Sequence, residues 1–454
     1  MSAGRVSADA ARRTLLLLTV TRWFPVGLTI GVTTLLALQR GMSLTQVGVI
    51  LSMQGFVVLG LELPTGGFAD ALGRRPVLLA AGAVALISGL TFVTAHTFGA
   101  FVIALVLQGL FRALDSGPLE AWYVDTAQAD DPHVRVEAAL AHAGTALGVS
   151  IASGALVSGA LVAWNPVPAK TALELPCWLA LGFYVVNLVA IAVRMREHRS
   201  DVGSTPIGRA LRSARDAPRT VAGGLRTLAS SPVLRALVLV EVFWSVGMIA
   251  FETFMPIRLS ELAGGQTRAG ALMGPVSAAA WGLFAVGSTL AGLVSRWIGA
   301  GWTALLVRAL NGALIVVKGL ATGPAGLITA FLFTYTVHGS GGPVHSALLH
   351  READAGNRTT VLSMNSMVAG GAYTVGLLVL GPLAERASTA LAVVVAGAFS
   401  IIGALLYLPA IRRGRAKGSP RSSCPRTSAS SRRSSGSCAC TTVARCGRTT
   451  SAAG

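Results

Sequence analysis

Apolar residues along this chain fall into long runs of about twenty positions, separated by short polar segments. A helix needs about 20 apolar residues to cross about 30 Å of hydrocarbon, so each run predicts one membrane span. The runs lack the strict alternation of apolar and polar positions that a transmembrane barrel requires. The pattern therefore predicts an all-α membrane protein with about twelve transmembrane helices. The spans are expected near residues 14–38, 44–64, 76–96, 98–123, 135–163, 171–193, 233–257, 270–295, 301–321, 323–349, 358–382 and 388–411.

A polar, arginine-rich segment interrupts the apolar pattern and leaves six spans on either side of it. We expect an N-terminal six-helix bundle at 1–193, a cytoplasmic linker at 194–232, a C-terminal six-helix bundle at 233–411 and a disordered tail at 412–454. The tail is rich in Arg, Ser and Cys and has no apolar period. In the linker, apolar residues alternate with arginines, which leaves open a helix on the membrane surface or a solvated connection.

Charge indicates the orientation of the spans. The chain is 53% hydrophobic and 12% charged, and its net charge of +18 comes almost entirely from arginine. With the N-terminus inside, the inner segments carry most arginines and the outer loops few, which is the positive-inside pattern. We therefore expect a multi-pass protein of the cell's inner (plasma) membrane, embedded in the lipid bilayer, with both termini cytoplasmic. No basic patch with interleaved aromatic residues occurs, so no nucleic-acid partner is expected.

The segment between the second and third spans carries a Gly-rich pattern with fixed charges. Most short membrane loops need only polarity, so this detail points to a function. The segment closely resembles the cytoplasmic loop after the second helix of major facilitator superfamily transporters, whose pattern runs G-x-L-A-D-R-x-G-R-R-x-x-L. Phe68 and Ala71 depart from that pattern, and Ala71 removes its first basic residue. The matching positions are Gly66, Ala69, Asp70, Gly73, Arg74, Arg75 and Leu78.

This resemblance implies a fold of two pseudo-symmetric six-helix bundles and a gate on the cytoplasmic side. In such transporters, the loop Asp and the Arg four residues later engage a carboxylate at the cytoplasmic end of the fourth span and contact the opposite half. Asp125 is expected to be that carboxylate here, with Glu120 as the alternative. A loop whose arginines only set the orientation remains the simpler interpretation. The expected gating set is Gly66, Asp70, Gly73, Arg74, Arg75 and Asp125.

The two halves of the chain repeat weakly. Residues 292–299 follow the eighth span as residues 66–73 follow the second, without the Asp and the paired Arg. Gln108-Gly109 in the fourth span also matches His338-Gly339 in the tenth. Two related halves agree with the implied fold, in which the substrate binds near the midplane between them.

Charged side chains inside the bilayer are costly, so each one within a predicted span is a functional candidate. Glu252 and Lys318 lie near the expected outer ends of their spans, from which long side chains can reach the interface. The full set is Arg22, Glu62, Arg112, Asp115, Glu120, Glu241, Glu252, Arg308 and Lys318.

Arg112 and Asp115 are three positions apart, which places them on neighbouring positions of one face of the fourth span, near mid-membrane. A carboxylate beside an arginine keeps its charge and takes up a proton when that partner is lost. Asp115 is therefore a candidate to couple proton uptake to rearrangement, and a structural ion pair is the alternative. Arg22 and Glu241 lie in spans that line the central cavity in this superfamily. Glu241 is expected to bind a cationic substrate, to carry a proton or to balance Arg308.

The chain resembles bacterial drug and metabolite efflux members of the superfamily, although two of their patterns are incomplete. Gln108-Gly109 is present, but Leu105 stands where proton-coupled exporters have Arg, and the fifth span has glycines without their proline. We expect a monomeric secondary transporter that exports a small, partly apolar compound by antiport with protons. A proton-coupled symporter that imports a metabolite and a non-transporting membrane sensor on the same fold remain alternatives.

Enzyme chemistry is not expected. The glycines at 339–342 lack the following Lys-Ser of a phosphate-binding loop. His338 and His345 share one face of the tenth span and are expected to pack or to line a cavity rather than to bind metal. No cofactor and no metal site are expected.

Overall fold

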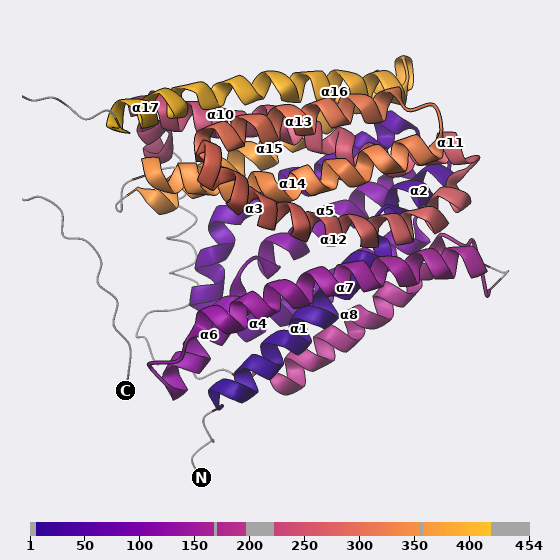
Figure 1. Cartoon of the computed structure of the whole chain (residues 1–454). Coiled ribbons are helices and arrows are strands. Elements are labelled where there is room, and N and C mark those ends of the chain that lie inside the picture. The colour runs from indigo at the N-terminus through magenta and orange to yellow at the C-terminus, as the bar shows by residue number, and fades with distance from the viewer. Residues whose placement is uncertain (1–5, 168–169, 197–221, 354–356, 419–454) are drawn as a thin grey trace, which may run out of the picture.

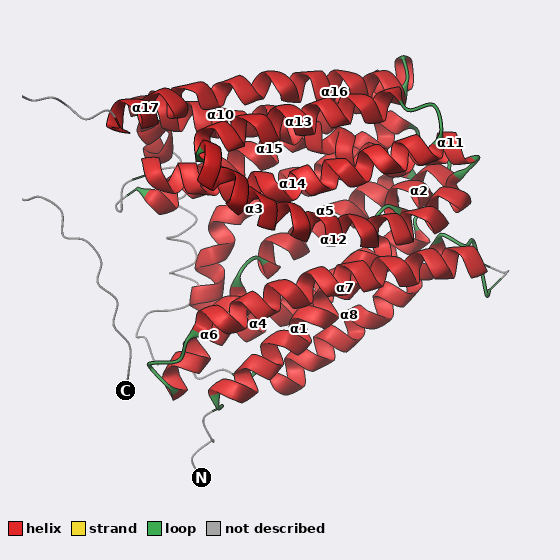
Figure 2. Ribbon diagram, in the orientation of Figure 1, coloured by secondary structure: helices red, strands yellow, loops and turns green. Residues whose placement is uncertain are grey.

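The computed structural model describes residues 6–167, 170–196, 222–353 and 357–418, without the side chains of residues 62–71, 359 and 414–418. Most of the predicted linker and all of the predicted tail beyond Gly418 lie outside this part. Within it, the chain forms helices and short connections and no β-strand (Figure 2). The first half contains α1 (Ala8–Thr29), α2 (Val32–Gln39), α3 (Leu44–Leu72), α4 (Arg74–Thr94), α5 (Phe98–Asp115), α6 (Pro118–Asp130), α7 (Val136–Trp164) and α8 (Glu174–Arg194).

The second half begins after the linker and continues in the same manner. Its elements are α10 (Pro232–Met248), the π-helix η1 (Ile249–Thr253), α11 (Phe254–Ala263), α12 (Gln266–Ile298), α13 (Ala300–Leu320), α14 (Pro324–Glu352), α15 (Arg358–Arg386), α16 (Thr389–Ala404), the 3-10 turn η2 (Leu405–Tyr407) and α17 (Leu408–Gly418). The last helix continues past Ile411, so the first residues of the predicted tail are helical.

Ten of the described helices are long and apolar enough to cross a membrane, and the bent pair α1–α2 makes eleven. Helix α14 has 29 residues, as many as α7 and α15, but is less apolar than α7. Including it gives twelve spans in the described chain, as the sequence predicts. Two spans are broken at glycines of positive φ: α1–α2 at Gly31 (φ 75°) and α5–α6 at Gly117 (φ 92°), a backbone conformation that side chains disfavour.

The two halves have the same packing scheme. In the first half, the helix pairs that pack closely are α1–α7, α1–α8, α3–α5, α4–α5 and α4–α8. In the second half they are α10–α15, α10–α16, α12–α14, α13–α14 and α13–α16, which are the same pairs of positions when each half is counted from its first span. The two extensive contacts between the halves are α3–α15 and α7–α12. Each joins the second span of one half to the fifth span of the other, so the pseudo-symmetry relates the two contacts. The molecule is therefore two pseudo-symmetric six-helix bundles.

Among the described helices, the two halves pack tightly against each other at only one end of the molecule. There, one buried apolar cluster contains Val32 and Val162 of the first half together with Ile257, Met273 and Leu377 of the second. At the other end, where α1 begins and α17 ends, the described residues form two separate clusters, one in each half. Figure 1 shows the same difference: the halves lie closer at the end with α2 and α11 than at the end with α6 and α17.

Glycines bring the helices of the tight end together. A Cβ atom on Gly274 of α12 would lie 2.6 Å from the Cα of Gly159 on α7, so this crossing requires glycine. Across the other contact, the Glu385 carboxylate of α15 accepts hydrogen bonds from the Thr45 backbone N–H and the Ser43 hydroxyl, both at 2.8 Å. We call these two contacts, α7–α12 and α3–α15, the seams.

Candidate functional site

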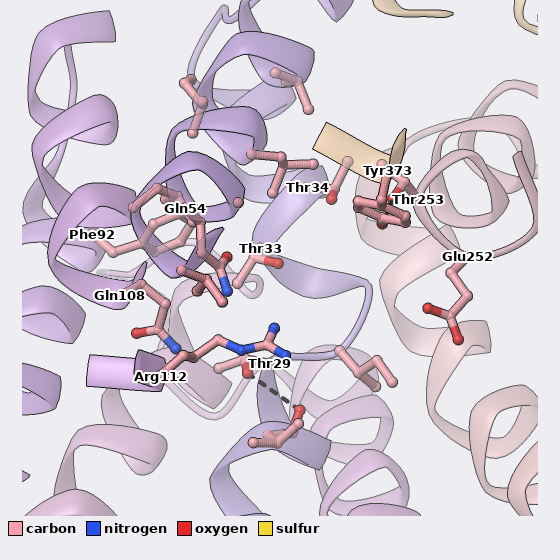
Figure 3. Close-up of a pocket in the computed structure, with 18 of the residues that line it drawn as sticks. Thr29, Thr33, Thr34, Gln54, Phe92, Gln108, Arg112, Glu252, Thr253 and Tyr373 are labelled. Carbon is pink, nitrogen blue, oxygen red and sulfur yellow. Dashed lines mark hydrogen bonds between the residues drawn. The ribbon is translucent and has the colours of Figure 1, made fainter. Parts of the chain in front are cut away.

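A cavity of about 690 Å³ lies between the two halves (Figure 3). This volume is in the range of pockets that hold drug-sized molecules. Val26, Ile30, Val58, Leu59 and Met248 give it an apolar wall. Its polar lining comes from both halves and includes Thr29, Thr33, Thr34, Gln54, Gln108, Arg112, Glu252, Thr253 and Tyr373.

Arg112 lies on the first-half side of this cavity, one turn after Gln108 on α5. The predicted pairing of Arg112 with Asp115 is wrong, since among the described side chains no carboxylate lies within ion-pair distance of Arg112. Helix α5 ends at Asp115, and the turn at Ser116 and Gly117 follows directly. The Asp115 carboxylate therefore sits at the helix end and reaches a neighbouring helix.

Asp115 pairs with Arg22 of α1, whose Nε lies 2.5 Å from Asp115 Oδ2. The two side chains are only 12% and 19% exposed. The Arg22 guanidinium also lies 4.4 Å from the ring centre of Phe111 and 4.9 Å from that of Trp23. Two candidates that the sequence placed in separate groups thus form one ion pair inside the first half.

Glu241 lies inside the second half and does not line the cavity. Its Oε1 is 3.3 Å from Arg308 and 3.1 Å from His345 Nε2. Tyr407 hydrogen-bonds to the other ring nitrogen of His345 at 2.8 Å. The Arg308 guanidinium lies 3.8 Å from the ring centre of Trp244. Among the interpretations that the sequence left open, the structure places Glu241 as the counter-ion of Arg308.

The Gly109–Gly339 correspondence has a structural cause. A Cβ on Gly109 of α5 would lie 2.7 Å from a backbone oxygen of α3, and one on Gly339 of α14 would lie 2.1 Å from a backbone oxygen of α12. Each glycine allows the fourth span of its half to cross the second at backbone distance. Asp115 and His345 follow these glycines at the same offset, so the two buried charge clusters occupy equivalent places in the two halves.

Glu252 lies on the second-half side of the cavity, in the π-helical turn η1. Tyr335 donates a hydrogen bond to its Oε1 at 3.1 Å. Behind it, Lys318 of α13 donates to the carbonyls of Ala250 and Phe251 at 2.6 and 2.7 Å. Lys318 is 0% exposed, so the expectation that it reaches the membrane interface is wrong. A buried ammonium with these two acceptors holds the turn from which Glu252 projects.

The predicted gating residues lie at the loose end of the molecule, which is the end with α6 and α17 where the two halves are farther apart. Helix α3 continues to Leu72, so the expected loop is mostly helical and turns at Gly73, whose φ is 95°. Arg74 forms an ion pair with Asp125 of α6. Arg75 donates to the carbonyl of Ala192 near the end of α8 at 2.7 Å. Both contacts stay within the first half. Gly66 and Asp70 both belong to α3, and the side chain of Asp70 lies outside the described part.

The family model of the Major Facilitator Superfamily matches residues 15–344, well over half of the chain. The chain belongs to this superfamily. Its members are transporters, so this protein is a membrane transporter rather than an enzyme. A search of curated protein sequences finds no match.

Solved superfamily transporters share this fold at low sequence identity. The nucleoside transporter NupG has a TM-score of 0.72 at 9% identity, over 88% of this chain and 99% of its own. A bacterial homologue of the human lysosomal transporter Spinster, in an inward-facing occupied conformation, gives 0.68 at 13%, over 89% and 97%. A bacterial homologue of the human drug peptide transporters PepT1 and PepT2 gives 0.64 at 12%, over 91% and 100%. At these identities the likeness concerns the fold alone.

The sequence alone gives no role for Glu252. In its predicted span this residue falls near the outer end, from which a charged side chain can reach the membrane interface. The signal that could have been used is the charge balance of two spans, since the seventh carries two acidic residues, Glu241 and Glu252, and the ninth carries the basic residues Arg308 and Lys318. Within the described residues, no three potential metal ligands converge.

Proposed function

We propose that this superfamily member is a proton-driven exporter of small, partly apolar compounds. The observation that carries the proposal is the central cavity, which both halves line with a mixture of apolar and polar side chains. A site shared by two bundles is suited to alternating access, because rocking of one bundle against the other exposes it to each side in turn. The export direction rests on the resemblance to bacterial efflux members of the superfamily, whose fourth-span pattern is present in part as Gln108-Gly109.

The proposed orientation places both chain termini in the cytoplasm. The loose end of the molecule would then face the cytoplasm and the seams would close the outer side. In that frame the cavity receives its compound from inside the cell, as an exporter requires. Arg74 and Asp125 are proposed, with Asp70, to act in the inner gate when the halves close there; Gly66, Gly73 and Arg75 would shape and anchor that loop.

Asp115 is proposed to carry the coupling proton, with Arg22 as its partner. A protonated Asp115 releases Arg22, and the exchange of that ion pair for a neutral carboxyl changes the contact between α1 and the α5–α6 turn. Because the turn leads into α6 and Asp125, the proton can be linked to the gate. Glu241 and Arg308 would serve as the equivalent fixed pair in the other half.

The test is transport by the full chain in proteoliposomes with an imposed pH gradient. Rhodamine B, ethidium and fluorescein serve as zwitterionic, cationic and anionic dyes of drug-like size. We expect at least one dye to accumulate against its gradient, and a protonophore to abolish this. Asp115→Asn should keep downhill exchange of that dye and lose accumulation. Restored accumulation in the double variant Arg22→Gln/Asp115→Asn would remove Asp115 as the proton carrier. Accumulation coupled to proton entry in the same direction would identify an importer.

A further inference from the structure

Arg112 and Glu252 present opposite charges to one cavity from opposite halves of the molecule (Figure 3). Arg112 belongs to α5 of the first half, and Glu252 to η1 of the second. They do not pair with each other, since no ion pair between them lies within 4.0 Å among the described contacts. Both residues line the cavity of about 690 Å³, so there is space for a molecule between the two charges.

Arg112 is the less compensated of the two charges. Every other arginine that the structure places deep in a span has a carboxylate partner: Arg22 has Asp115 and Arg308 has Glu241. Among the described residues, Arg112 has neither an ion pair nor a hydrogen bond. An arginine in a membrane interior needs an anionic or carbonyl partner, and its planar fork matches a carboxylate. An anionic group of a bound molecule would supply that partner.

The contacts around Glu252 hold its carboxylate at the cavity, where it can bind a cationic group. Lys318 fixes the carbonyls of Ala250 and Phe251, and the π-helical turn places the next side chain at the cavity. Tyr335 occupies one carboxylate oxygen with a hydrogen bond at 3.1 Å, and no described cation lies within ion-pair distance of the carboxylate. A carboxylate with spare acceptor capacity at a cavity wall attracts an ammonium group. Turns of this π type are rare and are often found at functional sites.

We infer that the cavity selects a small zwitterion, a molecule with an anionic group for Arg112, a protonated amine for Glu252 and an apolar body between them. This inference rests on the proposed function and names its substrate class. The apolar wall of Val26, Ile30 and Val58 contacts the body of the molecule. Because the two charges belong to different halves, the bound zwitterion bridges the bundles, and a molecule with only one of the two groups leaves one charge unpaired.

The experiment measures stabilisation of the purified full chain in detergent against thermal unfolding. The probes are linear ω-amino acids of graded chain length, their methyl esters and their N-acetyl derivatives. These three series carry both charges, the cation alone and the anion alone. Ligands that bind the folded state raise the unfolding temperature. We expect the zwitterions to stabilise at lower concentrations than either derivative, with one preferred length that matches the separation of the two charges.

The variants assign each charge. Arg112→Gln should remove the advantage of the zwitterion over the methyl ester, and Glu252→Gln its advantage over the N-acetyl compound. Loss of one charged hydrogen-bond partner should weaken half-saturation roughly tenfold to a hundredfold. Arg135→Gln and Glu137→Gln are matched controls, because both side chains are exposed outside the cavity. These two variants should bind all three series as the unmodified protein does.

Two results would overturn the inference. One is equal stabilisation by the zwitterions and by a singly charged series. The other is a zwitterion preference that persists in both Arg112→Gln and Glu252→Gln. The binding assay needs no proton gradient, so it is separate from the test of transport. Proton-driven dye accumulation without a preference for zwitterions would contradict only this inference. Zwitterion binding without proton-driven transport would contradict only the proposed function.

Discussion

The buried ion pair between Glu241 and Arg308 contributes to the stability of the second half. The two side chains are only 7% and 4% exposed, and the Nη1 of Arg308 has no hydrogen-bond partner among the described atoms. Removing the carboxylate leaves a guanidinium with Tyr407 and the face of Trp244 as its remaining contacts. Neither carries a full negative charge, so the arginine would be buried without compensation.

Glu241→Gln should therefore destabilise the protein by about 3–5 kcal/mol, the range for breaking a buried pair. The double change Glu241→Gln/Arg308→Met removes both charges and should recover most of that loss, since an apolar side chain of similar volume fills the site. The thermal unfolding midpoint and the folded yield in detergent measure both effects. Glu137→Gln, on an exposed carboxylate, is the control. A Glu241→Gln protein as stable as the unmodified chain would refute the assigned role of the pair.

The sequence located the charged residues of the site well but not all of their partners. Its motif indicated Arg74 and Asp125, and the structure brings them together, because a family pattern encodes long-range contacts that spacing alone does not. The partner of Asp115 was wrong, since it depends on where α5 ends and on the approach of α1. The orientation of Glu252 depends on a π-helical turn, which no periodicity of the chain reveals.

At the scale of elements, glycines allow the close helix crossings within each half, and Gly339 is one of them. Gly339 of α14 faces the backbone of Phe284, and a Cβ there would lie 2.1 Å from the Phe284 oxygen. Backbone cannot move aside as a flexible side chain does, so α14 and α12 would have to separate. The same helix offers a matched position in Gly342, around which nothing lies within 4 Å.

Gly339→Ala should cost about 1–3 kcal/mol, as overpacking does in a close-packed interior. Gly342→Ala adds the same methyl group to the same helix and should leave stability unchanged or slightly raised, because alanine favours helix over glycine. Thermal unfolding of the two variants side by side tests this. Equal midpoints would show that the α12–α14 crossing adapts and that the glycine there is not needed for packing.

The elements themselves were largely predictable, because apolar runs of the right length fix where spans must lie. Their breaks were not. The expected spans at 14–38 and 98–123 are each two helices, divided at Gly31 and Gly117. A single glycine within an apolar run gives no warning of its φ. The expected loop after the second span is helical up to Leu72, because α3 continues beyond its apolar run.

At the scale of the whole molecule, the seams hold the halves together at one end and determine which side of the cavity is closed. Gly159 and Gly274 meet at the α7–α12 seam with almost no room for a side chain. A large residue at Gly274 would oppose this closure without touching the cavity charges. Cys177, which lines the cavity, provides a native reporter of access from that end.

Gly274→Leu should shift the population towards states open at the seam end and increase labelling of Cys177 by a membrane-impermeant maleimide from that side several-fold. The tail cysteines Cys424, Cys438, Cys440 and Cys446 are first replaced by serine, so that Cys177 alone reports. Gly282→Leu is the control, since this glycine of the same helix has nothing within 4 Å. Unchanged labelling of a well-folded Gly274→Leu protein would show that the seam does not control access.

The π-helical turn also has a consequence for how such a chain can change over generations. A π turn contains one residue more than the α-helical turn it replaces, so Ile249–Thr253 is the place where span seven could lose a residue and keep both flanking helices aligned. That deletion would take away the acceptors of Lys318 and strand an ammonium in the interior. The extra residue of the π-helical turn and Lys318 of α13 should therefore be gained and lost together among related proteins.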